Sequence, residues 1–550
     1  MSSINLKHEN EIEDEAQGRT GFFRNIRIAR EEYTRFALFG LIFFIIGFIY
    51  SFMRILKDMF VMNKQDASSF NFIKIAYILP VSFFVVFYIN YLLQNRSVSK
   101  IFNMCIIVFT CLFISFGICI VFEDLIMFDS EPIKKSYDDS NVILKSFMYT
   151  IAEPISTMIY ISAELWGSII LSYLFLSYLN ESCSEKQHSR FIPPLFILAN
   201  VSLLTSAIVT TFMRKIKENL NDDELKIFMG GIFFVEAGLA IIILILKYIL
   251  ENRVMTKPIF IPIQKKIKKS KPKVGFKESL KTMKSSKFLM VMCAISFFCN
   301  ALYNLVETVF KFGIKAGAEA NNINKADHSA KFNNYDQYIT SISVIILNFT
   351  PFSNLSDTKG WIYVALISPI MALIAITVVF GLGIFNSALE NKSFSFFNKL
   401  IATGRPLYFI ENFSGMLILS AMKIFKYTSF DVTKERISMR IEDRYRPKFK
   451  SIYDGIFSKL GKSGGSLYGI FVNGIITDLD PRGSTPLTAV VGSLGVMVWM
   501  YGVIYLGGNY NKSLEKNECV DIDLIGDHHE GLEGEEKIVL DEKLKMKSTK

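Results

Sequence analysis

The sequence predicts an all-α integral membrane protein with twelve transmembrane helices in two six-helix bundles. Three observations support this fold class. Hydrophobic residues make up 51% of the 550 residues, and the mean hydropathy is +0.33, whereas globular chains have roughly 45–50% apolar residues. The apolar runs recur along the whole chain at close to the ~20 residues that cross a bilayer. A basic stretch at 251–287 divides these runs into two sets.

Each set contains six apolar runs, and each run is an expected helix. The run at 337–351 is short, and the run at 451–477 is weak because it contains many polar residues. The expected spans are 36–56, 71–94, 101–122, 152–179, 190–212, 226–250, 288–311, 337–351, 361–387, 404–424, 451–477 and 487–508.

The charge of the loops predicts the domain plan and the orientation. The basic stretches before the first span, at 251–287 and at 425–450, belong in the cytoplasm by the positive-inside rule, whereas the loop at 123–146 is acidic. Both termini are therefore expected to be cytoplasmic. The predicted parts are an N-terminal tail (1–35), a first bundle (36–250), a basic linker (251–287), a second bundle (288–508) and a disordered tail (509–550). This layout is like that of major-facilitator transporters.

Composition also excludes several classes of protein. The net charge of +10 is explained by basic cytoplasmic loops, so no nucleic-acid partner is expected. The seven cysteines are scattered, without the spacing of a metal site or a disulfide framework. No cofactor motif is present, and a catalytic constellation with histidine is absent. The sequence therefore predicts neither a metalloprotein nor a membrane enzyme.

Charged residues inside the first two spans are the first candidate site. Arg54, Lys57 and Asp58 are spaced i, i+3, i+4, so they share one face of a helix. Such groups are costly in a bilayer and are functional by default, although a snorkelling cluster near the interface is the alternative. Lys74, in the second span, adds another cation.

Carboxylates occur inside later spans. Glu164 lies in the middle of the fourth span, and Glu307 precedes Lys311 by one turn in the seventh. The Glu307–Lys311 pair occupies the place in the second half that Arg54–Asp58 occupies in the first, as a central binding site would require. Glu236, in the sixth span, ranks below these as a structural residue.

The eleventh span contains a glycine-rich segment, Gly461-Lys462-Ser463-Gly464-Gly465-Ser466. It is not a P-loop, because that motif would need glycine at Ile456. Glycines at membrane depth let a neighbouring helix or a ligand phosphate approach the backbone.

The candidate residues contain more cations than anions, which suits a multiply charged anion such as a phosphorylated metabolite. Lys57, Lys462, Arg54 and Lys74 are the cations, and Glu164 and Glu307 are the carboxylates. These carboxylates could hold the lysines when the site is empty, or they could contact a ribose and a base. The sequence leaves both roles open.

These residues, in this order, resemble the nucleotide transport proteins of the ATP:ADP antiporter family, and the usage of Lys, Asn, Ile and Phe resembles a microsporidian member. The similarity runs from about residue 30 to about residue 508. The segments that carry it are Arg54-Ile-Leu-Lys57-Asp58, Phe72-Ile-Lys74, Ala163-Glu164-Leu-Trp166-Gly167, Ala199-Asn200, Asn304-Leu-Val-Glu307 with Lys311, Lys426 to Glu435, and Gly461 to Ser466.

The resemblance implies an exchanger of ATP for ADP, with or without phosphate, that works by alternating access. It implies that Lys57, Glu164, Glu307 and Lys462 are essential, with Arg54, Asp58, Lys74, Lys311, Asn200 and Ser463 in secondary roles. The expected partners are ATP, ADP, other purine nucleotides, phosphate and the lipid bilayer, and the expected state is a monomer.

Two alternatives stay open. The same fold could serve a proton-coupled net importer of nucleotides or nucleosides, with Glu164 and Glu307 as proton carriers. The expected location is the plasma membrane of an intracellular parasite that imports host ATP, and the alternative is the membrane of a mitochondrion-derived organelle.

Overall fold

The structure is a computed structural model in which every regular element is helical across the described residues. Residues 28–520 are described, apart from 94, 184, 257–283, 285, 351–359, 402, 442–445, 473–479 and 517. Of the predicted disordered tail (509–550), residues 521–550 lie outside the described residues, as do most of the N-terminal tail and most of the basic linker. Residues 509–516 differ from the prediction, because they are helical as the end of α24.

The first half of the chain contains six long helical spans and a short outer hairpin. Its elements are η2 (Arg30–Glu32), α2 (Tyr33–Lys64), α3 (Ser69–Ile73), η3 (Lys74–Ile78), α4 (Leu79–Leu92), α5 (Val98–Val121), α6 (Glu123–Ile126), α7 (Glu131–Tyr137), α8 (Val142–Ala152), α9 (Pro154–Leu165), η4 (Trp166–Leu174), α10 (Phe175–Ser182), α11 (Glu185–Lys217), α12 (Asp222–Ile249) and η5 (Leu250–Val254).

The second half repeats this plan with more interruptions. Its elements are α14 (Lys287–Ala320), α15 (Lys325–Phe349), α17 (Trp361–Ala375), η8 (Ile376–Phe380), α18 (Gly381–Leu389), α19 (Ser395–Leu400), α20 (Tyr408–Phe425), η9 (Lys426–Phe430), α21 (Asp431–Met439), α22 (Arg446–Lys450), η10 (Ser451–Phe457), α23 (Ser458–Phe471) and α24 (Thr485–Lys516).

Each of the twelve predicted spans falls on a helix, and nine helices in the described part of the chain are long and apolar enough to cross a membrane. The other three predicted spans correspond to α15, α20 and α23, the helices with the most interrupted apolar runs. Integral membrane character is confirmed. The count of twelve and the domain boundaries stay predictions.

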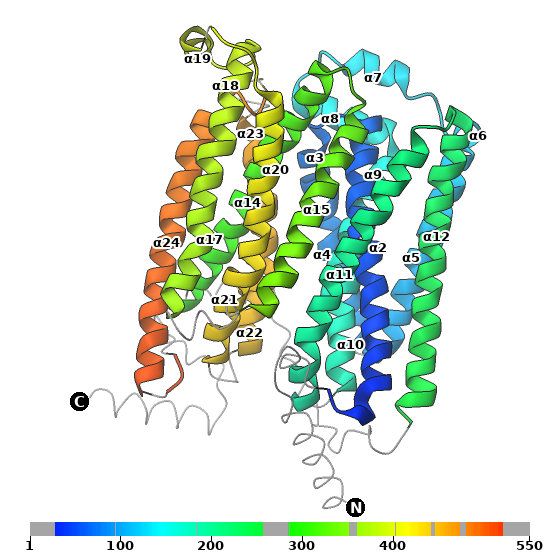
Figure 1. The fold of residues 1–550 in the computed structure, drawn as a ribbon, viewed down its shortest axis with the longest axis vertical. Helices are drawn as coiled ribbons and strands as arrows, with labels where there is room; N and C mark the ends of the chain where they lie inside the picture. Colours follow the sequence, from blue (N-terminus) through cyan, green and yellow to red (C-terminus); the bar gives the residue numbers. More distant parts are fainter. Residues whose placement is uncertain are drawn as a thin grey trace, which may run out of the picture.

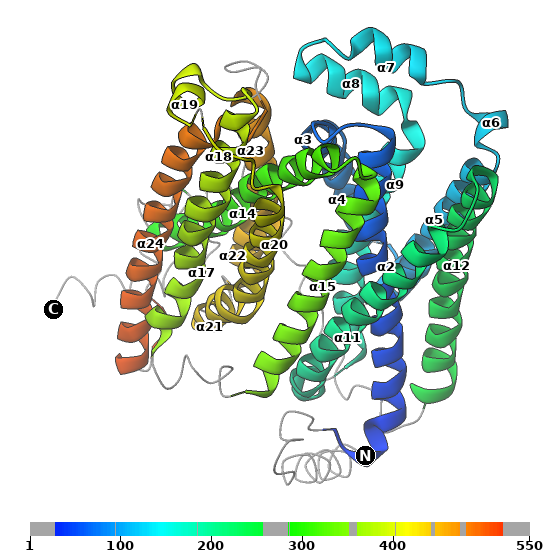
Figure 2. The same ribbon diagram turned by 45° about the horizontal axis from the view of Figure 1, so that its top comes forward.

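The helices form two groups that stand side by side (Figure 1). One group contains α2, α5 and α12, the other contains α17, α20 and α24, and α15 lies between them. The hairpin of α7 and α8 lies at one end of the molecule, called the outer end here, and α2 begins at the opposite, inner end (Figure 2). Helices suit this setting because each satisfies its own backbone hydrogen bonds in lipid.

The buried apolar residues form two cores. One core consists only of residues between Ile28 and Val254. The other combines the second half with a few residues of the first half, among them Val61, Ala67 and Phe70. These lie at the outer end of α2, in α3 and in the connection between the two helices, so the two halves share apolar packing on the outer side of the molecule.

Candidate substrate-binding site at the centre

The charged face of α2 lies inside the protein. Lys57 and Asp58 are only 4% and 5% exposed, and one turn before them Arg54 is partly buried. A snorkelling cluster would place these groups at the lipid headgroups, so burial among other helices favours the interpretation as a site. All three side chains point towards the centre because they share one face of α2, as their spacing predicts.

Within the first half, Lys57 is fixed by α9. Its Nζ donates to Glu164 Oε1 at 2.6 Å and lies 3.9 Å from the centroid of the Tyr160 ring. Carboxylate and aromatic face both favour a cation. Glu164 therefore holds Lys57 in a defined position, which is the first of the two roles left open by the sequence.

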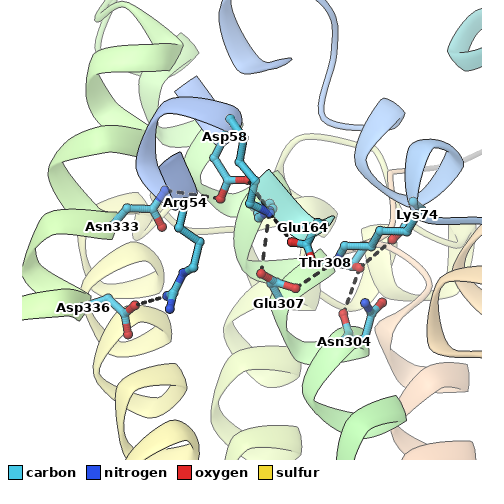
Figure 3. Close-up of polar contacts among 12 residues, drawn as sticks. Arg54, Asp58, Lys74, Glu164, Asn304, Glu307, Thr308, Asn333 and Asp336 are labelled. Atoms are coloured by element: carbon cyan, nitrogen blue, oxygen red, sulfur yellow. Dashed lines mark hydrogen bonds and ion pairs between the residues drawn. The ribbon is translucent and has the colours of Figure 1, made fainter. Parts of the chain in front are cut away.

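Two further ion pairs join the halves. Lys74 Nζ lies 2.9 Å from Glu307 Oε2, and Lys311 Nζ lies 3.1 Å from Asp58 Oδ1. Figure 3 shows Glu307 between the α2 residues and Lys74. Each pair takes one partner from each half, so the centre is built at the junction of the two bundles. Any rearrangement of the halves must break these pairs.

A second group of charges lies on the opposite side of the centre. Asp336 on α15 accepts from Arg54 at 3.2 Å, from Ser420 at 2.8 Å, and from Lys423 on α20. Figure 3 shows Arg54 and Asp336 on the far side of Glu307 from Lys74. Sequence reasoning missed Asp336 and Lys423, although the cost of charge in a span would have identified Lys423 inside the predicted span 404–424.

Like Lys426, which donates to Asn300, Lys462 has no ion-pair partner among the described residues. Its side chain is exposed. The charged groups that interact with it most strongly are Glu164, Lys426 and Glu307, all at the centre. A cation in the midst of the membrane span that no protein group neutralises is available to an incoming anion.

The glycines around Lys462 serve a helix contact. A Cβ on Gly461 would collide with the backbone oxygen of Phe297, and a Cβ on Gly465 would lie 2.8 Å from the backbone oxygen of Ala301. Both neighbours belong to α14. Of the two explanations for this segment, the structure therefore supports the close approach of a neighbouring helix, which brings Lys462 to the centre.

Two secondary candidates do not join the cluster. Asn200, on α11, donates to the backbone oxygen of Phe196 in its own helix. Ser463 follows Lys462 on α23 and is half-buried. The sequence analysis named Lys426 only as part of a family segment, and the structure shows that it donates to Asn300 at 3.0 Å. Thr308, which donates to Asn71 across the halves at 3.1 Å, was missed.

The centre carries an excess of positive charge. Among the described residues, this central set comprises seven cations and four carboxylates, which is three more positive groups than negative ones. The cations are Arg54, Lys57, Lys74, Lys311, Lys423, Lys426 and Lys462, and the carboxylates are Asp58, Glu164, Glu307 and Asp336. Such a field in a low-dielectric setting attracts a multiply charged anion.

On the outer side of the centre, two ion pairs join the halves, and a cavity lies beside them. Lys315 pairs with Asp66, and Lys217 lies 2.7 Å from Asp327, each joining the two halves. A cavity of about 350 Å³ lies at this end, lined by residues of both halves and of the outer hairpin. Among the described residues, no group of His, Cys, Asp or Glu could hold a metal ion.

Long apolar helices in two groups, with paired and unpaired charges where they meet, define a multi-pass membrane carrier rather than an enzyme. Residues 11–510 match the family described as TLC ATP/ADP transporter. This match covers most of the chain, and the chain belongs to that family.

The chain is 44% identical over 536 residues to ADP,ATP carrier protein 1 of Encephalitozoon cuniculi (strain GB-M1), covering 96% of both chains. It is 32% identical to ADP,ATP carrier protein 1 of Paranosema grylli, covering 94% of this chain and 96% of that one. The corresponding protein of Chlamydia trachomatis serovar D is 27% identical, at 84% and 85% coverage. These relatives confirm the predicted microsporidian type.

Among solved structures, the nucleoside transporter NupG aligns with a TM-score of 0.48 and 12% sequence identity, covering 86% of this chain and 99% of that chain.

Proposed function

We propose that this protein exchanges ATP for ADP across a membrane by alternating access. The observation that carries the proposal is the excess of positive charge at the junction of the two halves, with Lys462 unpaired. An adenine nucleotide supplies the negative charge that this centre lacks. The relatives named as ADP,ATP carriers favour exchange over proton-coupled import.

In this proposal the phosphates bind lysines from both halves. Lys57 contributes from α2 and Lys462 from α23, while Glu164 and Glu307 keep Lys57 and Lys74 in place when no substrate is bound. An arriving triphosphate competes with these carboxylates for the lysines. Binding would thereby weaken the Lys74–Glu307 pair that joins the halves, which would let them move.

The same electrostatics explains why the carrier would exchange rather than leak. Bringing Lys57 and Lys462 together without an anion places like charges close to each other in a low-dielectric centre. A bound nucleotide neutralises both lysines, so the halves change their relative position readily only when loaded. Return of the binding site then requires a second nucleotide, and this gives antiport.

The finer assignments belong to the same proposal. We infer a monomer in the plasma membrane of an intracellular parasite, importing host ATP with both termini in the cytoplasm, and the membrane of a mitochondrion-derived organelle is the alternative. Phosphate and other purine nucleotides are further substrates in this proposal.

Uptake of ATP labelled in the α-phosphate tests the proposal. Intact bacteria expressing the full chain should accumulate label, and unlabelled ADP added outside should expel it. Label that enters and stays would replace exchange by net import. Absence of uptake of any nucleotide, with the protein present in the membrane, would overturn the function.

A further inference from the structure

Three tyrosines lie near the Arg54 guanidinium at the centre. Tyr50 is one turn before Arg54 on α2, Tyr303 is one turn before Glu307 on α14, and Tyr427 is one turn after Lys423. Positions one turn apart share a helix face, so all three point to the centre. Each interacts electrostatically with the Arg54 guanidinium.

The hydroxyl groups of these tyrosines are unused by the protein. In the described part of the chain none of the three has a hydrogen-bond partner, and none of the three hydroxyl oxygens is a buried unsatisfied atom. Tyrosines elsewhere behave differently: Tyr453 donates to Ser438 at 2.9 Å, and Tyr338 donates to the backbone oxygen of Ala207 at 3.0 Å. Tyrosine hydroxyls inside a protein usually find a partner.

The aromatic rings are accessible and are held in place. Tyr427 is 49% exposed, and Tyr50 and Tyr303 are half-buried. The Tyr50 ring packs against Gly167, where a Cβ would collide with it. Lys423 Nζ lies 6.0 Å from the centroid of the Tyr303 ring.

We propose that Tyr50, Tyr303 and Tyr427 form the subsite for the nucleobase and set the preference of the carrier among bases. The inference rests on the proposed nucleotide exchange. Aromatic rings offer stacking surfaces to a base, and hydroxyls that can donate or accept are able to read its edge. The polar Arg54–Asp336 pair lies beside these rings.

The placement matches the shape of a nucleotide. The candidate phosphate ligands Lys57 and Lys462 interact with Glu164, whereas Arg54 and Asp336 lie on the other side of Glu307 (Figure 3). Lys57 follows Tyr50 by seven positions, which is about 10 Å along α2. A base against the tyrosines would therefore leave its phosphates among the lysines.

Competition among nucleotides tests the subsite. The full chain is reconstituted into vesicles loaded with ADP, and uptake of labelled ATP is measured against unlabelled ATP, GTP, CTP and UTP. In Tyr303→Leu and Tyr427→Leu, the ATP concentration at half-maximal uptake should rise roughly tenfold, as expected for loss of a stacking partner. Competition by the pyrimidine nucleotides should change less, so discrimination among bases should shrink.

Matched variants separate base recognition from folding. Tyr303→Phe and Tyr427→Phe keep the ring and should keep the affinity for ATP while changing the ratio of ATP to GTP. Gly167→Ala keeps every tyrosine but displaces Tyr50, and should also reduce discrimination. Tyr363→Leu, at a side chain that is 72% exposed, should leave both affinity and discrimination unchanged.

Two results would overturn the subsite: unchanged competition in all the tyrosine variants, or an equal loss for all four nucleotides. An equal loss for all four nucleotides is instead expected for Lys462→Ala, because Lys462 is proposed to bind the phosphates that every nucleotide carries. If the unsubstituted protein exchanged no nucleotide, the proposed function itself would be overturned. This outcome is distinguishable from failure of the subsite, because it is seen without any variant.

Discussion

At the scale of single residues, the division between paired and unpaired lysines decides what each one contributes. Lys57 is buried against Glu164, whereas Lys462 is exposed at the centre without an ion-pair partner in the described region. Removing Lys57 leaves the Glu164 carboxylate unpaired, and removing Lys462 leaves no such group. The two residues therefore differ in their effect on stability although both are expected to bind phosphate.

We expect Lys57→Ala and Lys462→Ala each to abolish exchange, and only Lys57→Ala to destabilise the protein. Loss of one partner of a fully buried ion pair costs about 3–5 kcal/mol. The Glu164 side chain is 30% exposed, so the loss should be smaller than this, but the melting temperature of Lys57→Ala should still fall. Uptake of labelled ATP and thermal unfolding in detergent measure the two effects. Lys226→Ala is the control, since Lys226 pairs with the exposed Asp124. Full transport by either site variant would refute its assignment.

Glu236 is a residue whose environment argues against a charge. It is 1% exposed, and neither carboxylate oxygen has a hydrogen-bond partner among the described residues. An unpaired buried charge costs several kcal/mol, so the neutral isostere in Glu236→Gln should keep stability and exchange. Thermal unfolding and ATP uptake check this. Loss of uptake with intact folding would instead favour proton carriage and revive the proton-coupled alternative.

Site residues could be identified from the sequence where their partners lie within about one helical turn, and not where their partners lie far away in the chain. The i, i+4 spacing was enough to place Arg54 and Asp58 on one face, and Glu307 with Lys311. Asp336 could not be assigned, because its partners Arg54 and Lys423 are far away in the chain and it lies one residue before the expected span 337–351. Asn200 shows the converse: a motif that marks a family does not place its side chain.

At the scale of elements, the contact between α23 and α14 depends on glycine. Gly465→Ala would bring a methyl group to 2.8 Å from a backbone oxygen of α14, whereas Gly455→Ala, in η10, meets nothing within 4 Å. Overpacking of this kind costs about 1–3 kcal/mol. We expect Gly465→Ala to lower the melting temperature and the affinity for ATP, because Lys462 moves with the helix. Gly455→Ala should match the unsubstituted protein, and equal behaviour of both variants would contradict the contact.

Three elements of the second half meet at a buried arginine. Arg482, just before α24, is fully buried and lies 2.9 Å from both Glu390 and Asp480 and 3.5 Å from Glu411 on α20. Its replacement leaves Asp480 and Glu411 without an ion-pair partner among the described residues, whereas Glu390 keeps Lys392 at 3.0 Å. Arg482→Met should therefore lose roughly 3–5 kcal/mol of stability and lower the yield of folded protein. Thermal unfolding with bound ADP measures it, and a melting temperature within one degree of the unsubstituted protein would refute the role.

Helix positions were predictable where the apolar run was long, because spanning a bilayer fixes the length of such a run. The predicted span 226–250 lies within α12 and η5, and 361–387 lies within α17, η8 and α18. The spans 337–351 and 451–477 were weaker for the same reason that they matter: α15 and α23 carry polar groups to the centre. Their polarity reflects contact with other helices rather than with lipid: α15 packs on α2 and α11 of the first half, and α23 packs on α14 of its own half.

At the scale of the whole molecule, two layers of contacts keep the halves together on the outer side. Apolar packing joins the outer ends of α2 and α3 to α14, and the pairs Asp66–Lys315 and Lys217–Asp327 lie at the same end. Alternating access requires both layers to separate. Because the apolar layer does not titrate, a pH dependence of this closure would come from the titratable groups at the same end, which are the two ion pairs and His328 on α15.

The Asp66–Lys315 pair predicts how the outer closure responds to substitution and pH. Burial raises the pKa of the Asp66 carboxyl, but the Lys315 ammonium outweighs burial and keeps that pKa below its ordinary value. A depressed pKa contributes stability above the pKa of the unfolded state and loses it only as the pH falls through the lower folded value. Closure should therefore be constant between about pH 5 and pH 8, and should weaken only below about pH 4.

Labelling of a single cysteine at Phe312→Cys, which lines the outer cavity, measures this closure once the exposed Cys111 and Cys519 are replaced by serine. Asp66→Asn should speed labelling by an impermeant maleimide severalfold, because the pair no longer holds the halves. Asp124→Asn, which removes an exposed ion pair at the same end, should not. Equal labelling in all variants would mean that apolar packing alone closes the outer side. A labelling rate that changes between pH 5 and pH 8, after correction for the reagent, would mean that a group other than Asp66 controls the opening.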